Sequence, residues 1–179
     1  MANVSRLTLP PSMFIPDEEG IIDGSDVPAV QDNLNGRVCW KFPDGSDESA
    51  IVSQPFVVPS QITSGNSLIL RLFTHGDAAP GGSSGVAWQA AWEAITESDA
   101  HDLEGTGDAF AAAQAVNADV DAAAGELNVD DISFSQAQAD AIEPGDYARI
   151  VIRRDSDDAV NDDYADSVWL TAVELLEVT

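Results

Sequence analysis

The feature that most constrains the fold is a series of short segments in which apolar and polar residues alternate. In residues 67–74, for example, Leu68, Leu70 and Leu72 would lie on one face of an extended chain. Turn residues such as Pro43-Asp44-Gly45 separate these segments. We predict strands at residues 37–42, 50–58, 67–74, 86–95, 127–134, 147–153 and 168–178. Seven or eight short strands of this kind imply an all-β fold, an antiparallel β-sandwich resembling a jelly roll.

Two stretches are less clearly extended. Residues 110–124 are rich in alanine, which favours a helix, but their small side chains form no helical stripe, so a strand followed by a loop fits equally well. Ser135 and Gln138 match a helix-capping pattern, which predicts one or two turns of helix before Pro144. The prediction is therefore a sandwich with at most one or two short helices.

The first part of the chain differs from the rest. Residues 1–36 are rich in Pro, Gly, Asp and Asn and show no sustained periodicity. We interpret them as an extended N-terminal arm, which packs either on its own domain or on a neighbouring chain. Residues 37–179 then form the β-sandwich domain.

The charge of the chain excludes several classes of partner. With 32 acidic and 7 basic residues the net charge is −25, so nucleic acid is not expected as a partner, because phosphate contacts need cations. An anionic membrane surface is disfavoured for the same reason. No apolar stretch approaches the roughly 20 residues of a membrane span, and no secretory signal precedes the first strands, so we expect synthesis in a cytoplasm. Such a surface repels itself unless salt screens it, which favours marine or hypersaline surroundings.

No catalytic residues are predicted. Residues 81–85 match the G-x-S-x-G pattern around Ser83, but that motif needs a strand before it and a helix after it. Here a flexible loop fits better, and the only candidate bases, His75 and His101, lie in polar sequence. The lone Cys39 sits in an alternating run, where a small buried role is expected. We therefore expect no enzyme activity.

The acidic residues between 155 and 166 are the best candidate for a metal site, since Ca²⁺ takes six to eight oxygen ligands. Ala159 and Val160 break the EF-hand pattern, and two separated histidines with one cysteine do not make a zinc site. The favoured interpretation is a solvated loop in which Arg153 or Arg154 pairs locally, with a structural calcium ion as the alternative. We assign no metal-binding and no cofactor-binding residues, and expect no cofactor.

Four tryptophans, Trp40, Trp88, Trp92 and Trp169, could form an aromatic platform for sugars. Each lies within an apolar run, however, so packing in the core is the expected role. A carbohydrate-binding module would need an exposed aromatic patch and would commonly hold a structural calcium ion.

From about Ala50 onward the chain resembles a domain of tailed-phage and marine viral structural proteins. The matching motifs follow one another in the order Phe56–Pro59, Gly65–Phe73, Gly85–Trp88 with Trp92, Gly145–Asp155, and Asp166–Leu175. The resemblance covers about two-thirds of the chain and implies a β-sandwich or jelly-roll virion protein without catalytic residues.

The resulting hypothesis is a capsid decoration, or cement, protein that binds and stabilises the outer capsid shell. Its expected partners are the major capsid protein or other virion proteins, and a homo-oligomer such as a trimer is expected, located in the virion. A tail fibre or receptor-binding component is the alternative within viruses. A carbohydrate-binding β-sandwich module is the alternative of another class.

Overall fold

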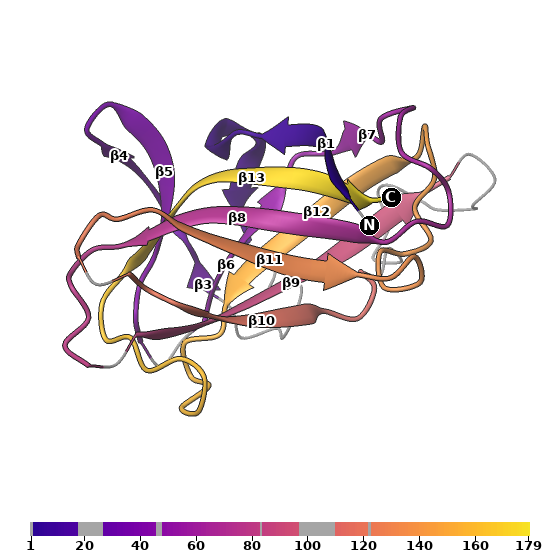
Figure 1. The fold of residues 1–179 in the computed structure, drawn as a ribbon. Coiled ribbons are helices and arrows are strands. Elements are labelled where there is room, and N and C mark those ends of the chain that lie inside the picture. Colours follow the sequence, from indigo (N-terminus) through magenta and orange to yellow (C-terminus); the bar gives the residue numbers. More distant parts are fainter. Residues whose placement is uncertain (1, 18–26, 46–47, 83, 97–109, 122) are drawn as a thin grey trace.

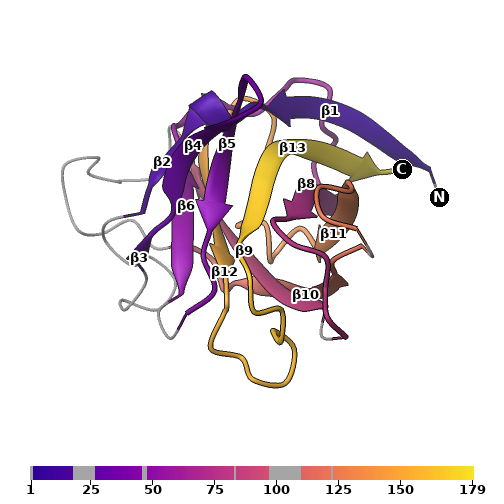
Figure 2. The same cartoon turned by 90° about the vertical axis from the view of Figure 1, so that its left-hand side faces the viewer.

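The computed structural model describes residues 2–17, 27–45, 48–82, 84–96, 110–121 and 123–179. Two sheets, which we call sheet A and sheet B, pack face to face (Figures 1 and 2). Their strand pairs are antiparallel apart from one short parallel pair. The predicted all-β sandwich is therefore confirmed.

Sheet A contains the two ends of the chain. Its strands, in spatial order, are β11 (Asn128–Phe134), β8 (Leu68–Gly76), β13 (Val168–Val178), β5 (Arg37–Phe42) and β4 (Val30–Leu34), with β1 (Asn3–Leu9) also paired to β13. The backbones of Ala2 and Thr179 exchange two hydrogen bonds, of 3.0 and 2.9 Å, so the described ends lie side by side (Figure 1).

Sheet B forms the second layer. Its strands, in spatial order, are β10 (Gln114–Asp119), β9 (Gly85–Ile95), β12 (Tyr147–Arg154), β6 (Ser49–Ser53) and β2 (Phe14–Pro16), with β7 (Phe56–Val57) on β12 and β3 (Val27–Pro28) parallel to β6. A single 3-10 turn, η1 (Pro11–Met13), precedes β2.

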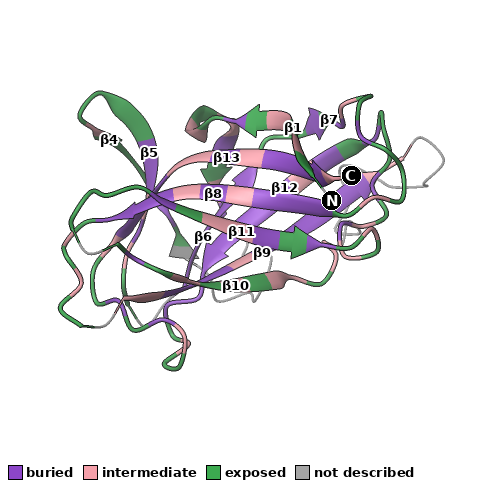
Figure 3. Ribbon diagram, in the orientation of Figure 1, coloured by how far each residue is buried: buried purple, intermediate pink, exposed green. Residues whose placement is uncertain are grey.

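The core lies between the sheets, where the alternating apolar faces meet (Figure 3). The predicted inner face of β8, with Leu68, Leu70 and Leu72, is fully buried. Trp88 and Trp92 of β9 are equally buried, and Trp88 packs edge-on against the ring of Phe42, with 5.0 Å between centroids. The core role expected for the tryptophans is confirmed for Trp40, Trp88 and Trp92, whereas Trp169 is buried outside the core cluster and stacks on His75.

The less regular stretches form strands and turns. Within residues 110–124 the described part contains β10, so the extended alternative is correct. Pro55 separates β6 from β7, because proline cannot donate a ladder hydrogen bond. The short helix predicted after Ser135 is a series of turns instead, since Asp140 and Ala141 have φ of 55° and 52°, which no right-handed helix accommodates.

The segment that the sequence analysis described as an arm, residues 1–36, contributes strands to both sheets. β1 and β4 extend sheet A, and β2 and β3 extend sheet B, while residues 18–26 lie outside the described part. Whether residues 37–179 fold as a domain without this segment stays a prediction. Among the described residues, no helix is long and apolar enough to cross a membrane.

Candidate functional site

The outer face of sheet B carries charged side chains that are already paired. Arg149 donates to Glu93 on the neighbouring strand, with 2.9 Å between Nη2 and Oε1. Its guanidinium also lies 5.3 Å from the ring centroid of Phe110. Phe110 packs on a small apolar cluster of Ala50, Ala91 and Val151, whose side chains are buried. Among the described residues, the charge of Arg149 is therefore paired, and the apolar cluster beneath Phe110 is covered.

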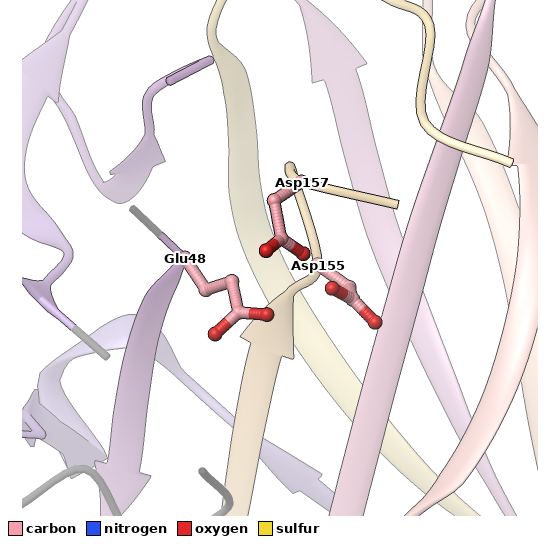
Figure 4. A group of neighbouring side chains, drawn as sticks. All are labelled: Glu48, Asp155 and Asp157. Atoms are coloured by element: carbon pink, nitrogen blue, oxygen red, sulfur yellow. The ribbon is translucent and has the colours of Figure 1, made fainter. Parts of the chain in front are cut away.

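A group of three carboxylates, from Glu48, Asp155 and Asp157, lies at one end of β12 (Figure 4). One carboxylate oxygen from each residue lies within 4.8 Å of the other two, a spacing compatible with a metal ion. However, Nη1 of Arg153 is 2.7 Å from Oε2 of Glu48, and Nη2 is 3.5 Å from Oδ2 of Asp155. Burial raises the pKa of Asp155, and the hydrogen bond with Glu48 and the charge of Arg153 oppose that shift. A guanidinium thus already neutralises part of the charge of this cluster, and calcium binding there stays untested.

The acidic loop, residues 155–166, is organised by the second arginine of β12. Arg154 is fully buried and pairs with Asp162, also buried, as the sequence-based interpretation of local pairing expected. Its Nη2 also donates to the backbone oxygen of Tyr164, at 2.6 Å. The contacts of Arg154 with Asp162 and Tyr164 therefore hold the acidic loop against the sandwich.

The residues considered for catalysis are not brought together. Gly81 and Gly82 belong to the connection between β8 and β9, and Gly85 is the first residue of β9, while Ser83 and His101 lie outside the described residues. His75, expected in a loop, is the penultimate residue of β8, where it is buried and stacks on Trp169 with 6.2 Å between ring centroids. No element of a serine-hydrolase site is assembled among the described residues.

The best candidate site is a cavity of about 460 Å³ on the outer face of sheet A. It lies where the β4–β5 hairpin, the end of β8, the turn before β11 and the middle of β13 meet. Its lining consists of Leu34, Asn35, Arg37, Cys39, His75, Gly125, Leu127 and Thr171. Apolar walls and polar groups therefore occur together, which is typical of small-molecule sites.

Two local irregularities in the backbone position this lining. Asn35 and Gly36 adopt φ of 51° and 81°, which makes the tight hairpin turn that places Arg37 opposite Leu34. The pairing of β13 with β8 shifts between Leu170 and Ala172, and the extra residue is Thr171, whose hydroxyl donates to the Phe73 carbonyl at 2.9 Å. Such bulges redirect a side chain and are common beside functional sites.

Cys39 forms part of the cavity wall and is buried, as its sequence context predicted. Burial raises the pKa of the thiol, a backbone hydrogen bond from Leu34 lowers it, and the nearby charge of Asp32 raises it further. The thiol is therefore held protonated near neutral pH, and its Sγ lies 3.6 Å from the backbone oxygen of Asp32. It serves as a wall of the cavity and is no activated nucleophile.

Sequence reasoning missed this cavity. Arg37, His75 and Thr171 lie on three different strands, and no local motif connects them. The Asn35-Gly36 pair is a hairpin signal that could have placed β4 beside β5. The bulge at Thr171 has no comparable signal in the sequence.

Comparisons with known proteins agree on the fold. No family model and no curated protein matches the chain. Among solved structures, the arabinose-bound MgGH51 α-L-arabinofuranosidase matches with a TM-score of 0.50 and 11% identity over 94% of this chain, which spans 23% of that chain. A CBM4 module matches with a TM-score of 0.44 and 16% identity, over 94% of this chain and 96% of the other. The CBM22-1 xylan-binding domain of Paenibacillus barcinonensis Xyn10C matches with a TM-score of 0.45 and 9% identity, over 100% of this chain and 99% of that domain's chain.

These matches overturn the virion hypothesis. The reported structures are carbohydrate-binding modules and a glycosidase, and viral structural proteins do not occur among the matches. Neither the resemblance to phage and marine viral proteins nor the function derived from it, a capsid decoration protein, is correct. The expected homo-oligomer stays a prediction.

Proposed function

We propose that this protein is a non-catalytic carbohydrate-binding module that holds a sugar unit of a polysaccharide in the cavity on sheet A. The observation that supports the proposal best is the mixed lining of this cavity. Leu34 and Leu127 offer apolar surface, while Asn35, Arg37 and His75 offer polar groups beside it. A sugar ring presents the same combination, because its C–H faces are apolar and its hydroxyl groups are polar.

The size and placement of the cavity fit such a ligand. About 460 Å³ lies within the range of small-molecule sites, of roughly 300–1,000 Å³. The cavity is open to one side, and an exposed apolar residue, Val129 on β11, continues beyond it on the outer face of sheet A. A sugar in the cavity could therefore continue into a longer chain across this surface.

The lining also explains why the proposed role is binding without catalysis. Glycoside hydrolysis commonly needs a pair of carboxyl groups on either side of the scissile bond. The described residues that line the cavity include no Asp and no Glu. The protonated thiol of Cys39 and the lone imidazole of His75 do not replace such a pair.

The proposal is tested by measuring binding of the full chain to a panel of neutral and acidic oligosaccharides by isothermal titration calorimetry. Leu127 is 57% exposed, so Leu127→Asn should preserve the fold while removing apolar contact with the sugar. We expect about tenfold weaker binding, the effect of losing roughly 1.4 kcal/mol of apolar contact.

Val57→Asn is the matched control, since Val57 is 65% exposed on β7 of the other sheet. It should bind like the unmodified protein. Binding that is equally affected by both substitutions, or absent for every oligosaccharide of the panel, would show that the cavity is not a sugar site.

A further inference from the structure

The seven basic residues of the chain fall into two groups. Five are held in ion pairs with carboxylates, namely Arg6–Glu177, Arg71–Asp131, Arg149–Glu93, Arg153–Glu48 and Arg154–Asp162. The other two, Arg37 and Lys41, make no ion pair with any described residue. The chain has 32 acidic residues, so this difference does not arise from a shortage of carboxylates.

Both unpaired cations belong to β5 on sheet A, and one of them, Arg37, lies at the cavity. Arg37 is exposed and lines the cavity directly. Lys41 follows four residues later on the same face of the strand, with its Nζ 5.2 Å from the ring centroid of Trp169. Trp169 in turn stacks on His75, which lines the cavity. The cavity is thus lined by one unpaired cation and an imidazole, with a second cation further along the same strand.

The cavity also differs in charge from other hollows of the molecule. Its described lining contains no acidic residue, whereas one further cavity is lined by Asp119 and Asp163, and another by Asp163 and Asp166. Asp32 lies across from Cys39 on β4, but it is outside the lining, and its carboxylate accepts the backbone N–H of Asn33 at 2.6 Å. This cavity is therefore a locally cationic site on a strongly acidic protein.

We propose that the sugar unit bound in this cavity carries a negative charge, and that Arg37 binds its anionic substituent. This inference rests on the proposed function and specifies the class of polysaccharide. A guanidinium donates two parallel hydrogen bonds to a carboxylate, the group of a uronic acid, and it binds a sulfate ester by the same chemistry. Leu34 and Leu127 would meanwhile contact the apolar side of the ring.

The net charge of −25 does not prevent such binding when salt is present. At about 0.15 M ionic strength the Debye length is about 8 Å, so acidic residues on distant parts of the surface are largely screened. A cation in direct contact with the ligand is screened much less. The polysaccharide should therefore bind at physiological or higher salt and be repelled at very low salt.

The test compares a hexamer of galacturonic acid with its fully methyl-esterified form, which is the same sugar without the charge. Affinities of the full chain are measured by calorimetry at about 0.15 M NaCl. We expect the acid to bind at least about tenfold more tightly than the ester, which corresponds to one charge-assisted contact. In Arg37→Gln the ratio of the two affinities, acid over ester, should fall to within about twofold.

Arg71→Gln is the matched control, because it removes the same charge from sheet A at a position paired with Asp131. It should keep the preference for the acid. A sulfated galactan hexamer distinguishes a sulfate ester from a carboxylate. If it binds more tightly than the galacturonate hexamer, and if this binding depends on Arg37, the ligand group is a sulfate ester. That result would also support the anionic class.

Failure of this inference is distinct from failure of the proposed function. If the ester or a neutral oligosaccharide binds in a manner that depends on Leu127, but the acids bind no better, sugar binding stands and the anionic class is wrong. If Arg37→Gln and Arg71→Gln weaken binding of the acid equally, the effect is one of overall charge, and the role of Arg37 is wrong. If no probe binds, both are overturned.

Discussion

The guanidinium of Arg154 and the carboxylate of Asp162 form a bidentate ion pair inside the sandwich. The distances are 2.8 Å from Nε to Oδ2 and 2.6 Å from Nη2 to Oδ1, and both side chains are inaccessible to solvent. Asp162 also accepts the backbone N–H of Ala87 on β9, at 3.2 Å. Two charged side chains thus connect β12, β9 and the acidic loop at one point.

This geometry predicts a large cost for removing one partner. Asp162→Asn removes the buried counter-charge of Arg154 and leaves only the more exposed Asp44, whose Oδ1 lies 3.7 Å from Nη2. Removing one partner of a buried ion pair typically costs about 3–5 kcal/mol. We expect the free energy of unfolding, measured with urea, to fall by that amount. Asp131→Asn breaks the half-exposed pair with Arg71 and should cost under about 1 kcal/mol. Equal losses in the two variants would contradict the role assigned to burial.

Glu177 provides a second, pH-dependent test. Burial alone would raise its pKa, but hydrogen bonds from Asn66, the backbone N–H of Thr63 and Arg6 lower it to about 2. Since the folded-state value lies below the ordinary 4.5, the stabilisation is complete above about pH 4.5 and is lost as the pH falls toward 2. Glu177→Gln should cost roughly 2–3 kcal/mol at pH 7.

The loss in Glu177→Gln should therefore shrink when urea unfolding is repeated at progressively lower pH. Glu143→Gln is the control, because Glu143 is exposed and accepts one hydrogen bond, from Ser64 at 3.0 Å. It should change stability by less than about 1 kcal/mol at any pH. A pH-independent loss in Glu177→Gln would mean that packing, rather than charge, accounts for its contribution.

Asp130 should show the opposite dependence on pH. Burial is the main cause that raises its pKa, the hydrogen bond from Thr74 opposes the shift, and the charges of Asp131, Asp121 and Asp119 add to it, so that the pKa is about 6. Because the folded-state value exceeds the ordinary 3.8, a penalty develops as the pH rises from about 4 to 6 and persists above. Asp130→Asn should stabilise the protein by on the order of 1–2 kcal/mol at pH 7 and by nothing below pH 4. Melting temperatures across this pH range test the prediction, and a gain that persists at pH 3.5 would refute it.

The net charge of −25 predicts stabilisation by salt. Adding NaCl from about 0.1 to 2 M screens repulsion between the acidic residues, so the melting temperature should rise by on the order of 5 °C or more. Differential scanning calorimetry at neutral pH measures this change. A melting temperature that stays constant or falls with added NaCl would show that repulsion between the acidic residues does not destabilise the fold. It would also remove the argument for saline surroundings.

The sequence predicted most of the framework because the framework depends on local alternation. β5 and β13 begin and end within a residue of the predicted bounds, and the inner face of β8 is as expected. The turns after Ser135 were harder to predict from the sequence, because a capping pattern over so few residues does not distinguish a helix from successive turns. The partner of Arg154 was also unpredictable, because many carboxylates follow it in the loop.

The candidate site could not be predicted, because it depends on the relative placement of distant strands. His75 meets Trp169 only through the pairing of β8 with β13, and Thr171 reaches the cavity only through the bulge. The mistaken viral resemblance has a related cause. Its most specific motifs, residues 145–155 and 166–175, correspond to β12 and β13 with their flanking turns. They are features of the sandwich framework, which proteins of many functions share.

The hydrogen-bonded seam between Ala2 and Thr179 makes the described chain nearly a closed ring. A short linker across the seam should permit a circular permutant with new ends at Gly81, where the backbone has open space around it. The seam lies at the Leu68 end of β8 and the cavity at the His75 end, about 20 Å away along the strand. A tether attached at the seam would therefore hold the domain at a point distant from the cavity and leave the cavity accessible.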